Sequence, residues 1–205
     1  MTVVRRLVLA SVSPRRRSLL DGAGFAHDAA SPGIDDAALR HTPGIDPAVW
    51  TMALAHLKAR SASRKFFGEE AMVPSSVVLL AADTIVVKHD QVIGQPADER
   101  DARRILQLLE NGHHRVMTGV ALLTRARRRL WFDEARVRVG ELGRDRIEGY
   151  LASGTWRGKA GAYNLSERLA DQWPIQYEGD PGTIMGLPMR RLAPMLRRLL
   201  VQGDD

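Results

Sequence analysis

This 205-residue chain contains the stretch Leu7-Val8-Leu9-Ala10-Ser11-Val12-Ser13-Pro14-Arg15-Arg16, in which an apolar segment is followed directly by a polar and basic one. The first half of the stretch belongs to the apolar run Val3–Ala10, which is typical of a strand covered on both faces. Ser13 and Pro14 then predict a helix start, because serine caps a first turn and proline fits the first helical position. The stretch therefore predicts that a buried strand, a tight loop and a helix N-terminus meet at Ser11–Arg16.

This helix start has the chemistry of a phosphate site. Unpaired backbone N–H groups and the positive end of the helix dipole favour an anion there. Ser11 and Ser13 add hydroxyl groups, and Arg15 and Arg16 can make bidentate contacts with phosphate oxygens. Two arginines in a first turn oppose the helix dipole, and a bound anion would remove that conflict. From spacing alone, a phosphate site and a solvated basic turn are about equally favoured.

The rest of the chain alternates irregularly between helical and strand patterns. Strands are predicted over Val77–Val87, Gln91–Ile93, Val116–Leu123 and Trp131–Val139. Helices are predicted from Ala48 to about Lys65, after an Asp98 cap, from an Asp145–Glu148 capping box to Leu151, and near Leu187–Val201. Such an irregular alternation predicts one α/β unit whose sheet is mixed rather than purely parallel.

Composition narrows the class of protein. Lys and Arg number 30 against 24 Asp and Glu, a net charge of +6 that favours anionic partners without distinguishing nucleic acid from nucleotide. The absence of cysteine excludes disulfides, thiolate zinc sites and a cysteine nucleophile. No run approaches the roughly 20 apolar residues of a membrane span. We therefore expect a cytoplasmic protein with no membrane partner.

Asp83-Thr84 is the second chemical signal, because it interrupts the apolar run Val77–Val87. We expect Asp83 at the end of a buried strand, where a carboxylate can serve as a base or a metal ligand. The alternative is a turn aspartate that caps its own backbone, and from this one residue alone that alternative is favoured.

Three further groups are weaker candidates. Lys58 lies on a helix rich in Ala and Leu, where a lysine often extends its charge to solvent. Asp35 and Asp36 offer oxygen ligands for Mg²⁺ together with substrate phosphates, although acidic pairs in loops are usually solvated. Lys159 stands within Gly158–Tyr163, whose small residues allow a backbone to approach a ligand closely, or simply make a flexible loop.

Six blocks in this order resemble the Maf (septum formation protein) family. They are Leu9–Arg16, Ala55–Ala59, Ala82–Thr84, His114–Val120, Lys159–Tyr163 and Met185–Pro188. Together they span nearly the whole chain, and six matches in register make a chance resemblance implausible.

The resemblance implies a nucleoside triphosphate pyrophosphatase, which hydrolyses the α–β phosphoanhydride of (d)NTPs, modified ones included, to a monophosphate and pyrophosphate. It also implies a divalent metal cation, Mg²⁺ or Mn²⁺. The implied fold is a two-lobed mixed α/β sheet flanked by helices, related to inosine triphosphatase-type enzymes. Residues 1–205 would form one such domain with the active-site cleft between the lobes, and a homodimer is common in the family.

The resemblance also implies roles for individual residues. Asp83 takes the place of the proton acceptor, and Ser11, Arg16 and Lys58 take the remaining polar positions of the site. Together with the residue chemistry above, this makes Asp83 and Lys58 the catalytic candidates, and Asp83 and Asp35 the metal-ligand candidates. The substrate-binding candidates are Ser11, Ser13, Arg15, Arg16, Thr84, Lys159 and Ser166. Among these, Arg15, Thr84 and Ser166 take the places that the family associates with specificity.

Departures from the family pattern leave the nucleobase open. Gln95 stands where the family often has lysine, and Asn164-Leu165-Ser166 replaces Gly-Ile-Gln. The alternatives are an enzyme specific for dTTP and UTP, or one specific for 7-methyl-GTP. A division regulator that binds nucleic acid and has lost catalysis is the rival from another class, suggested by the +6 charge and the basic turn Arg125–Arg129. Few aromatic residues and no known nucleic-acid module weigh against it, so no nucleic-acid partner is expected.

Overall fold

The computed structural model describes residues 4–34, 39, 41–68, 70 and 72–201. Its strands are β1 Arg6–Ala10, β2 His27–Ala30, β3 Val77–Lys88, β4 Gln91–Ile93, β5 Gly112–Leu123, β6 Arg128–Val139 and β7 Ile175–Glu178. Its helices are α1 Pro14–Gly22, α2 Pro47–Phe67, α3 Glu99–Leu109, α4 Arg144–Ala152, the 3₁₀ turn η2 Ala160–Ala162, α5 Leu165–Ala170, α6 Pro181–Met185 and α7 Met189–Val201.

The strands form a seven-stranded sheet in the order β2-β1-β3-β5-β6-β7, with β4 paired to β3. β1 runs parallel to β2 and β3, whereas the pairs from β3 through β5 and β6 to β7 are antiparallel. The predicted mixed α/β sheet is therefore confirmed. No helix in the described part of the chain is long and apolar enough to cross a membrane.

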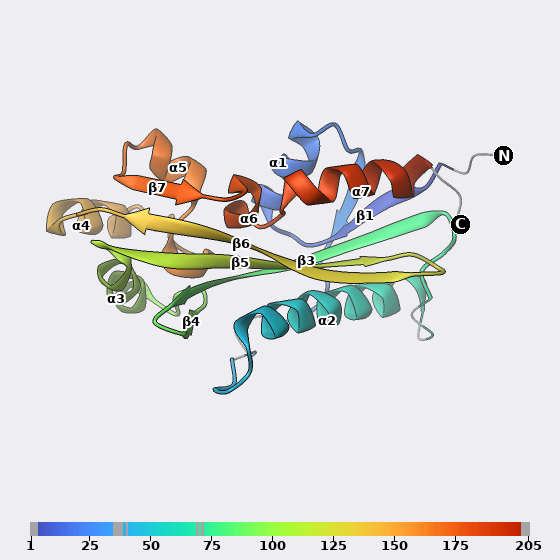
Figure 1. Ribbon diagram of the computed structural model, residues 1–205, viewed down its shortest axis with the longest axis horizontal. Helices are drawn as coiled ribbons and strands as arrows, with labels where there is room; N and C mark the ends of the chain where they lie inside the picture. The colour runs from blue at the N-terminus through green and yellow to red at the C-terminus, as the bar shows by residue number, and fades with distance from the viewer. Residues whose placement is uncertain (1–3, 35–38, 40, 69, 71, 202–205) are drawn as a thin grey trace.

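Helices cover both faces of the sheet around β1 and β3 (Figure 1). On β1, Leu7 and Leu9 pack beneath α1 and α7, while Val8 and Ala10 pack against α2. This period-two alternation explains the continuous apolar run, because a strand covered on both faces needs apolar residues at every position. The prediction of a doubly covered strand at the start of the chain is confirmed.

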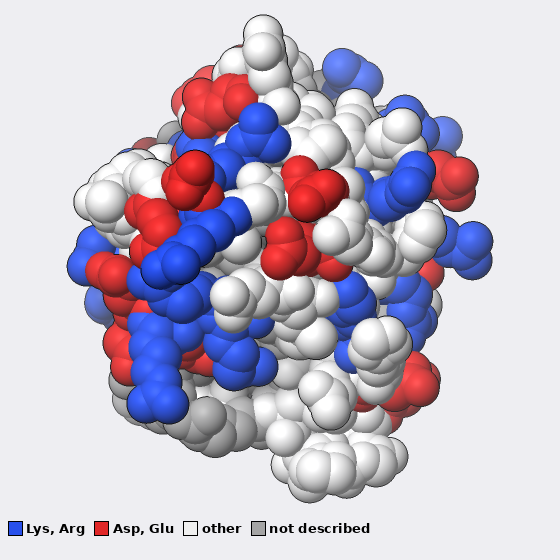
Figure 2. All heavy atoms as spheres, turned by 90° about the vertical axis from the view of Figure 1, so that its left-hand side faces the viewer, with Lys and Arg blue, Asp and Glu red and all other residues white. Residues whose placement is uncertain are grey.

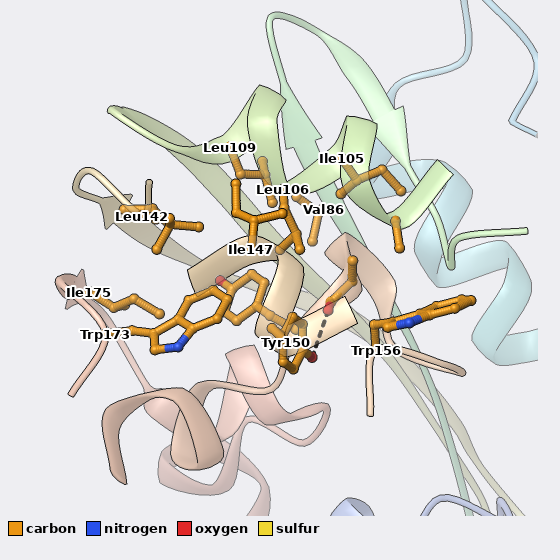
Figure 3. Close-up of a cluster of buried hydrophobic side chains, with 14 of the residues drawn as sticks. Val86, Ile105, Leu106, Leu109, Leu142, Ile147, Tyr150, Trp156, Trp173 and Ile175 are labelled. Atoms are coloured by element: carbon orange, nitrogen blue, oxygen red, sulfur yellow. Dashed lines mark hydrogen bonds between the residues drawn. The ribbon is translucent and has the colours of Figure 1, made fainter. Parts of the chain in front are cut away.

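A separate cluster fills the other end of the sheet. Apolar side chains of α3 and α4 pack there with Tyr150, Trp156 and Trp173, as Figure 3 shows. The Tyr150 hydroxyl donates a hydrogen bond of 2.9 Å to the carbonyl of Ala162, which ties α4 to η2. This cluster therefore anchors the segment that carries Lys159.

The sheet has a gap along one edge of β3. β1 pairs with β3 as far as Leu80, and β4 pairs with it only from Val86 onward. On the opposite edge β5 pairs without interruption, with Asp83 beside Gly119. The expectation that Asp83 ends a strand is wrong: β5 keeps the backbone extended through Asp83, and it is the neighbour β1 that ends there.

Helix α2 lies very close to the sheet beside this gap. A Cβ on Gly119 would come within 2.4 Å of the carbonyl oxygen of Thr51, so glycine is what allows the contact. The Thr51 hydroxyl in turn donates to the carbonyl of Asp83 at 3.1 Å and accepts from the Gly119 N–H at 3.3 Å. One turn of α2 is thus fixed against both β3 and β5.

Two local predictions differ from the structure. α4 begins after Gly143, so Asp145 lies inside its first turn, and Glu148 forms an ion pair with Arg103 instead of a capping box. The C-terminal helix begins at Met189 rather than Leu187. α5, β7 and α6 are each six residues or shorter, which is too short for hydrophobic periodicity to reveal.

A hydrogen bond between His114 on β5 and Tyr163 connects the end of η2 to the sheet. His114 Nε2 lies 2.8 Å from the Tyr163 hydroxyl, and both rings are buried. Burial lowers the pKa of His114 from its ordinary 6.5 to about 3, with smaller contributions from Lys88 and His113. In the folded protein the ring is therefore neutral throughout the mildly acidic range.

This depressed pKa predicts a pH-dependent stability. Between pH 6.5 and about 3 the unfolded chain binds a proton at His114 that the folded chain does not. The free energy of unfolding should therefore fall on acidification by up to about 1.4 kcal/mol per pH unit from this group. Urea unfolding of the wild type and of His114→Gln at pH 7, 6, 5 and 4 measures the effect. The variant has no imidazole at this position, so its unfolding free energy should lack the contribution of His114 to the pH dependence. A difference between the two proteins that stays constant over the series would contradict it.

Candidate functional site

A cleft of about 540 Å³ opens at the gap in the sheet, between the end of β1 and the segment around η2. Eight predicted site residues line it: Ser11, Ser13, Arg15, Arg16, Lys58, Asp83, Thr84 and Lys159. These residues come from four separate parts of the chain: the Ser11–Arg16 segment, α2, β3 and the segment before η2. Asp35 lies outside the described residues.

Asp83 and Lys58 form a buried ion pair at the floor of the cleft. Lys58 Nζ donates to Asp83 Oδ1 at 2.5 Å, and the two side chains are 5% and 9% exposed. The two side chains meet because successive side chains of β3 point to opposite faces of the sheet. Val77, Leu79 and Ala81 pack against α2, and Asp83 lies on the same face. Lys58 points inward from α2, so the alternative that it extends to solvent is wrong.

Thr84 is the next residue of β3 and points to the opposite face, towards α1 and α6. There its hydroxyl accepts a hydrogen bond of 3.2 Å from Arg16 Nη2. Arg16 also donates from Nε to the carbonyl of Gly186 at 3.0 Å and from Nη1 to Ser11 Oγ at 3.3 Å. Contacts from three elements therefore fix the direction of this guanidinium group.

The N-terminus of α1 faces the same cleft. Ser13 is its N-cap, as predicted, although its hydroxyl makes no capping hydrogen bond within the described residues. The Ser13 N–H instead donates to Ser11 Oγ at 3.2 Å. Arg15 is half-buried, and this burial lowers the pKa of its guanidinium, opposed by the charge of Glu167. The first turn of α1 thus directs backbone N–H groups and two arginines towards one space.

A second polar cluster lies at the η2 end of the cleft. Lys159 Nζ pairs with Glu167 Oε2, and Asn164 Nδ2 donates to Glu167 Oε1 at 2.9 Å. Burial alone would raise the pKa of Glu167, but the hydrogen bonds from Lys159 and Asn164 outweigh it, so the pKa is lowered. The carboxylate of Glu167 is therefore ionised and faces the cleft as a hydrogen-bond acceptor.

Ser166 has a different position from the other substrate-binding candidates. Its side chain is exposed, and its hydroxyl donates to Asn164 Oδ1 at 3.0 Å. It is not among the cleft-lining residues in the described part of the chain. Its neighbours Asn164 and Glu167 line the cleft instead.

The carboxylates around the cleft do not form a metal cage of their own. Among the described residues, no group of three or more His, Asp or Glu side chains is placed to hold an ion. Asp83 offers one carboxylate as a metal ligand, and its oxygen lone pairs can serve a metal ion in addition to Lys58. This donor set fits an ion that is held jointly by one carboxylate, phosphate oxygens and water.

Several cleft residues were given no role by sequence analysis. Asn164 and Glu167 lie just after the Lys159–Tyr163 block, where the chain departs from the family pattern, and only that departure marks the region. Gly186 lies within a recognised block, and its φ of +107° lets its carbonyl meet Arg16. Gln95, noted as the replacement of a lysine, also lines the cleft.

Comparison with known proteins identifies relatives along nearly the whole chain. A family model described as Maf-like protein matches residues 6–199. A dTTP/UTP pyrophosphatase of Koribacter versatilis is 35% identical over 192 residues, which cover 94% of this chain and 93% of that protein. A dTTP/UTP pyrophosphatase of Mesorhizobium japonicum is 38% identical over 200 residues, which cover 96% and 92%.

Among solved structures, the Staphylococcus aureus Ham1 protein aligns with 66% of this chain and 72% of its own length. The sequence identity is 10% and the TM-score is 0.41, a level too low to carry a conclusion. The match of the family model and the two relatives is decisive without it. The chain belongs to the Maf-like protein family.

Proposed function

We propose that this protein is a nucleoside triphosphate pyrophosphatase, which hydrolyses the α–β phosphoanhydride to a nucleoside monophosphate and pyrophosphate. One observation carries the proposal: the buried Lys58–Asp83 pair and the cationic N-terminus of α1 face the same cleft. The relatives named dTTP/UTP pyrophosphatase support the same reaction.

In this reaction a water oxygen forms a bond to the α-phosphorus while the bond to the bridging oxygen of the β-phosphate breaks. Asp83 would orient that water and accept its proton. Lys58 would hold the Asp83 carboxylate in place through their 2.5 Å contact. Phosphoryl transfer depends on an oriented water and on charge neutralisation, so no protein nucleophile is required.

The cations of the cleft would bind the triphosphate. Arg16 and the first turn of α1 offer N–H donors in fixed directions. Arg15 and Lys159 add positive charge, with Glu167 beside Lys159 as its counter-ion. We assign Ser11 and Ser13 to the same phosphate-binding end of the cleft.

A divalent cation, Mg²⁺ or Mn²⁺, would be held by Asp83 together with substrate phosphates. When bound, it would neutralise negative charge on the phosphate oxygens. Asp35 remains a second ligand candidate from the sequence. The absence of a three-carboxylate cage among the described residues agrees with an ion that is carried largely by the substrate.

The names of the relatives make dTTP and UTP the first nucleotides to test. The second is 7-methyl-GTP, the other alternative that the sequence left open. Arg15 and Thr84 line the cleft and retain their proposed roles in specificity. Ser166 retains its proposed role only if a bound base reaches beyond the cleft to its exposed hydroxyl. We therefore propose the reaction class and leave the nucleobase to experiment.

Three broader expectations remain proposals. The chain would work in the cytoplasm as one domain of two lobes with the cleft between them, and a homodimer is compatible with the family. The separate apolar clusters at the two ends of the sheet support the two-lobed description. At the end that carries α3, α4 and α5, Lys and Arg lie among Asp and Glu (Figure 2), so this face gives no uniform basic surface for nucleic acid.

The proposed reaction predicts pyrophosphate as the inorganic product. Purified protein with Mg²⁺ or Mn²⁺ should release pyrophosphate and a monophosphate from at least one of dTTP, UTP, GTP, 7-methyl-GTP, ATP, CTP or ITP. Chromatography of both products measures the outcome, and chelation with EDTA should stop it until metal is restored. Orthophosphate as the product, or no hydrolysis of any nucleotide, would overturn the proposal.

The role of Asp83 can be separated from its contribution to stability. Asp83→Asn should reduce kcat by about 100- to 10,000-fold, because it removes the proton acceptor. Either Asp83→Asn or Lys58→Gln alone breaks the buried ion pair between the two side chains, at a cost of about 3–5 kcal/mol in unfolding free energy.

The double variant Asp83→Asn, Lys58→Gln removes both charges and should recover much of the stability while remaining inactive. Urea unfolding and steady-state kinetics on all four proteins test this. Recovery of activity together with stability in the double variant would show that the pair is structural rather than chemical.

A further inference from the structure

A line of three threonines leads from Arg16 into the interior between β3, β5 and α6. Thr84 Oγ1, which accepts from Arg16, lies 2.9 Å from Thr118 Oγ1. Thr118 is fully buried, and its hydroxyl donates to the carbonyl of Thr183 at 2.7 Å. Thr84 and Thr118 are direct cross-strand partners, so the register of β3 and β5 sets this contact.

The direction of each hydrogen bond in this line is determined by its last member. The carbonyl of Thr183 can only accept, so the single hydroxyl proton of Thr118 is committed to it. Between the two hydroxyls Thr84 must therefore be the donor. Thr84 then meets the N–H of Arg16 with a lone pair, which is the orientation that the guanidinium requires.

The site is built closely around this arrangement. A Cβ on Gly186 would lie 3.0 Å from Arg16 Nε and 3.4 Å from Thr84 Oγ1, so glycine leaves room for both. The carbonyl of Thr183 also accepts from the N–H of Gly186 at 3.2 Å. Loss of the Thr118 hydroxyl would therefore leave this carbonyl satisfied and act mainly on Thr84.

We propose that Thr118 is a positioning residue for substrate binding: through Thr84 it holds the guanidinium of Arg16 in the direction that receives the phosphate chain. The proposal rests on the proposed function, because Arg16 is assigned there to the triphosphate. Thr118 itself is too deeply buried to contact a nucleotide. It acts by keeping the proton of Thr84 turned away from Arg16.

The same arrangement has a consequence for recognition at Thr84. With its proton committed to Thr118, Thr84 can present only a lone pair to the cleft. A group of the nucleotide that contacts this hydroxyl must therefore bring an O–H or N–H donor. This fits a sugar hydroxyl or a base N–H, and it excludes an ionised phosphate oxygen.

The test is a double-mutant cycle between Thr118 and Arg16. Thr118→Val removes the donor with little change of shape and should raise KM about tenfold, since a displaced binding group costs up to about 100-fold. Thr118→Ser keeps the donor and should stay within about twofold of wild type. In the Arg16→Ala background Thr118→Val should have no further effect, because the residue that it positions is gone. Arg17→Ala is the charge-matched control, since Arg17 is exposed and bonds the carbonyl of Val12.

Titration of inorganic tripolyphosphate into the same proteins gives a second readout that needs no turnover. Its affinity should fall by the same factor in Thr118→Val, so the cycle can be completed even if no nucleotide is hydrolysed and the proposed function fails. Wild-type affinity in Thr118→Val, or equal losses with and without Arg16, would overturn the positioning role. If Thr118→Val does not fold, Thr84→Val breaks the same line one step earlier. Its effect on tripolyphosphate affinity should show the same dependence on Arg16, because tripolyphosphate has no base or sugar group that could contact the Thr84 hydroxyl directly.

Discussion

The buried contact between Lys58 and Asp83 is the interaction on which the rest of the site depends. Removing two charges from water costs several kcal/mol per ion, and a buried ion pair often stabilises a fold no better than apolar residues of similar size. Its presence at the floor of the cleft therefore needs a reason other than stability. Helix α2 must lie close to the sheet to bring Lys58 to Asp83, and Gly119 is the residue that allows this approach.

The cleft forms because strand β3 extends beyond the end of its neighbour β1. β1 ends at Ala10, while β3 continues to Lys88 and remains paired to β5. Successive residues of β3 then point to opposite faces, so Asp83 meets α2 and Thr84 meets Arg16. A single strand thereby holds the Asp83 carboxylate and the Lys58 ammonium group on one face of the sheet and the Arg16 guanidinium on the other.

The sequence predicted the parts of this site that have a local pattern. The strand before Ser11, the helix after Ser13 and the polar break at Asp83 all follow from periodicity and capping chemistry. It placed Asp83 wrongly at a strand end, because pairing with β5 is a long-range property that no window of residues contains. The inward direction of Lys58 and the roles of Glu167, Gly186 and Thr118 were not predicted for the same reason: each depends on a partner more than 20 residues away or on a turn that has no sequence period.

In the proposed reaction, one cleft binds the triphosphate by the first turn of α1 and presents its α-phosphorus to Asp83. A crystal structure of the protein with Mg²⁺ and an α,β-imido nucleoside triphosphate, which resists cleavage, tests this most directly. We expect phosphate oxygens within hydrogen-bond distance of the Ser11–Arg16 backbone and of the Arg16 side chain, with Asp83 facing the α-phosphorus. A triphosphate bound outside this cleft, or bound with its α-phosphorus turned away from Asp83, would contradict it.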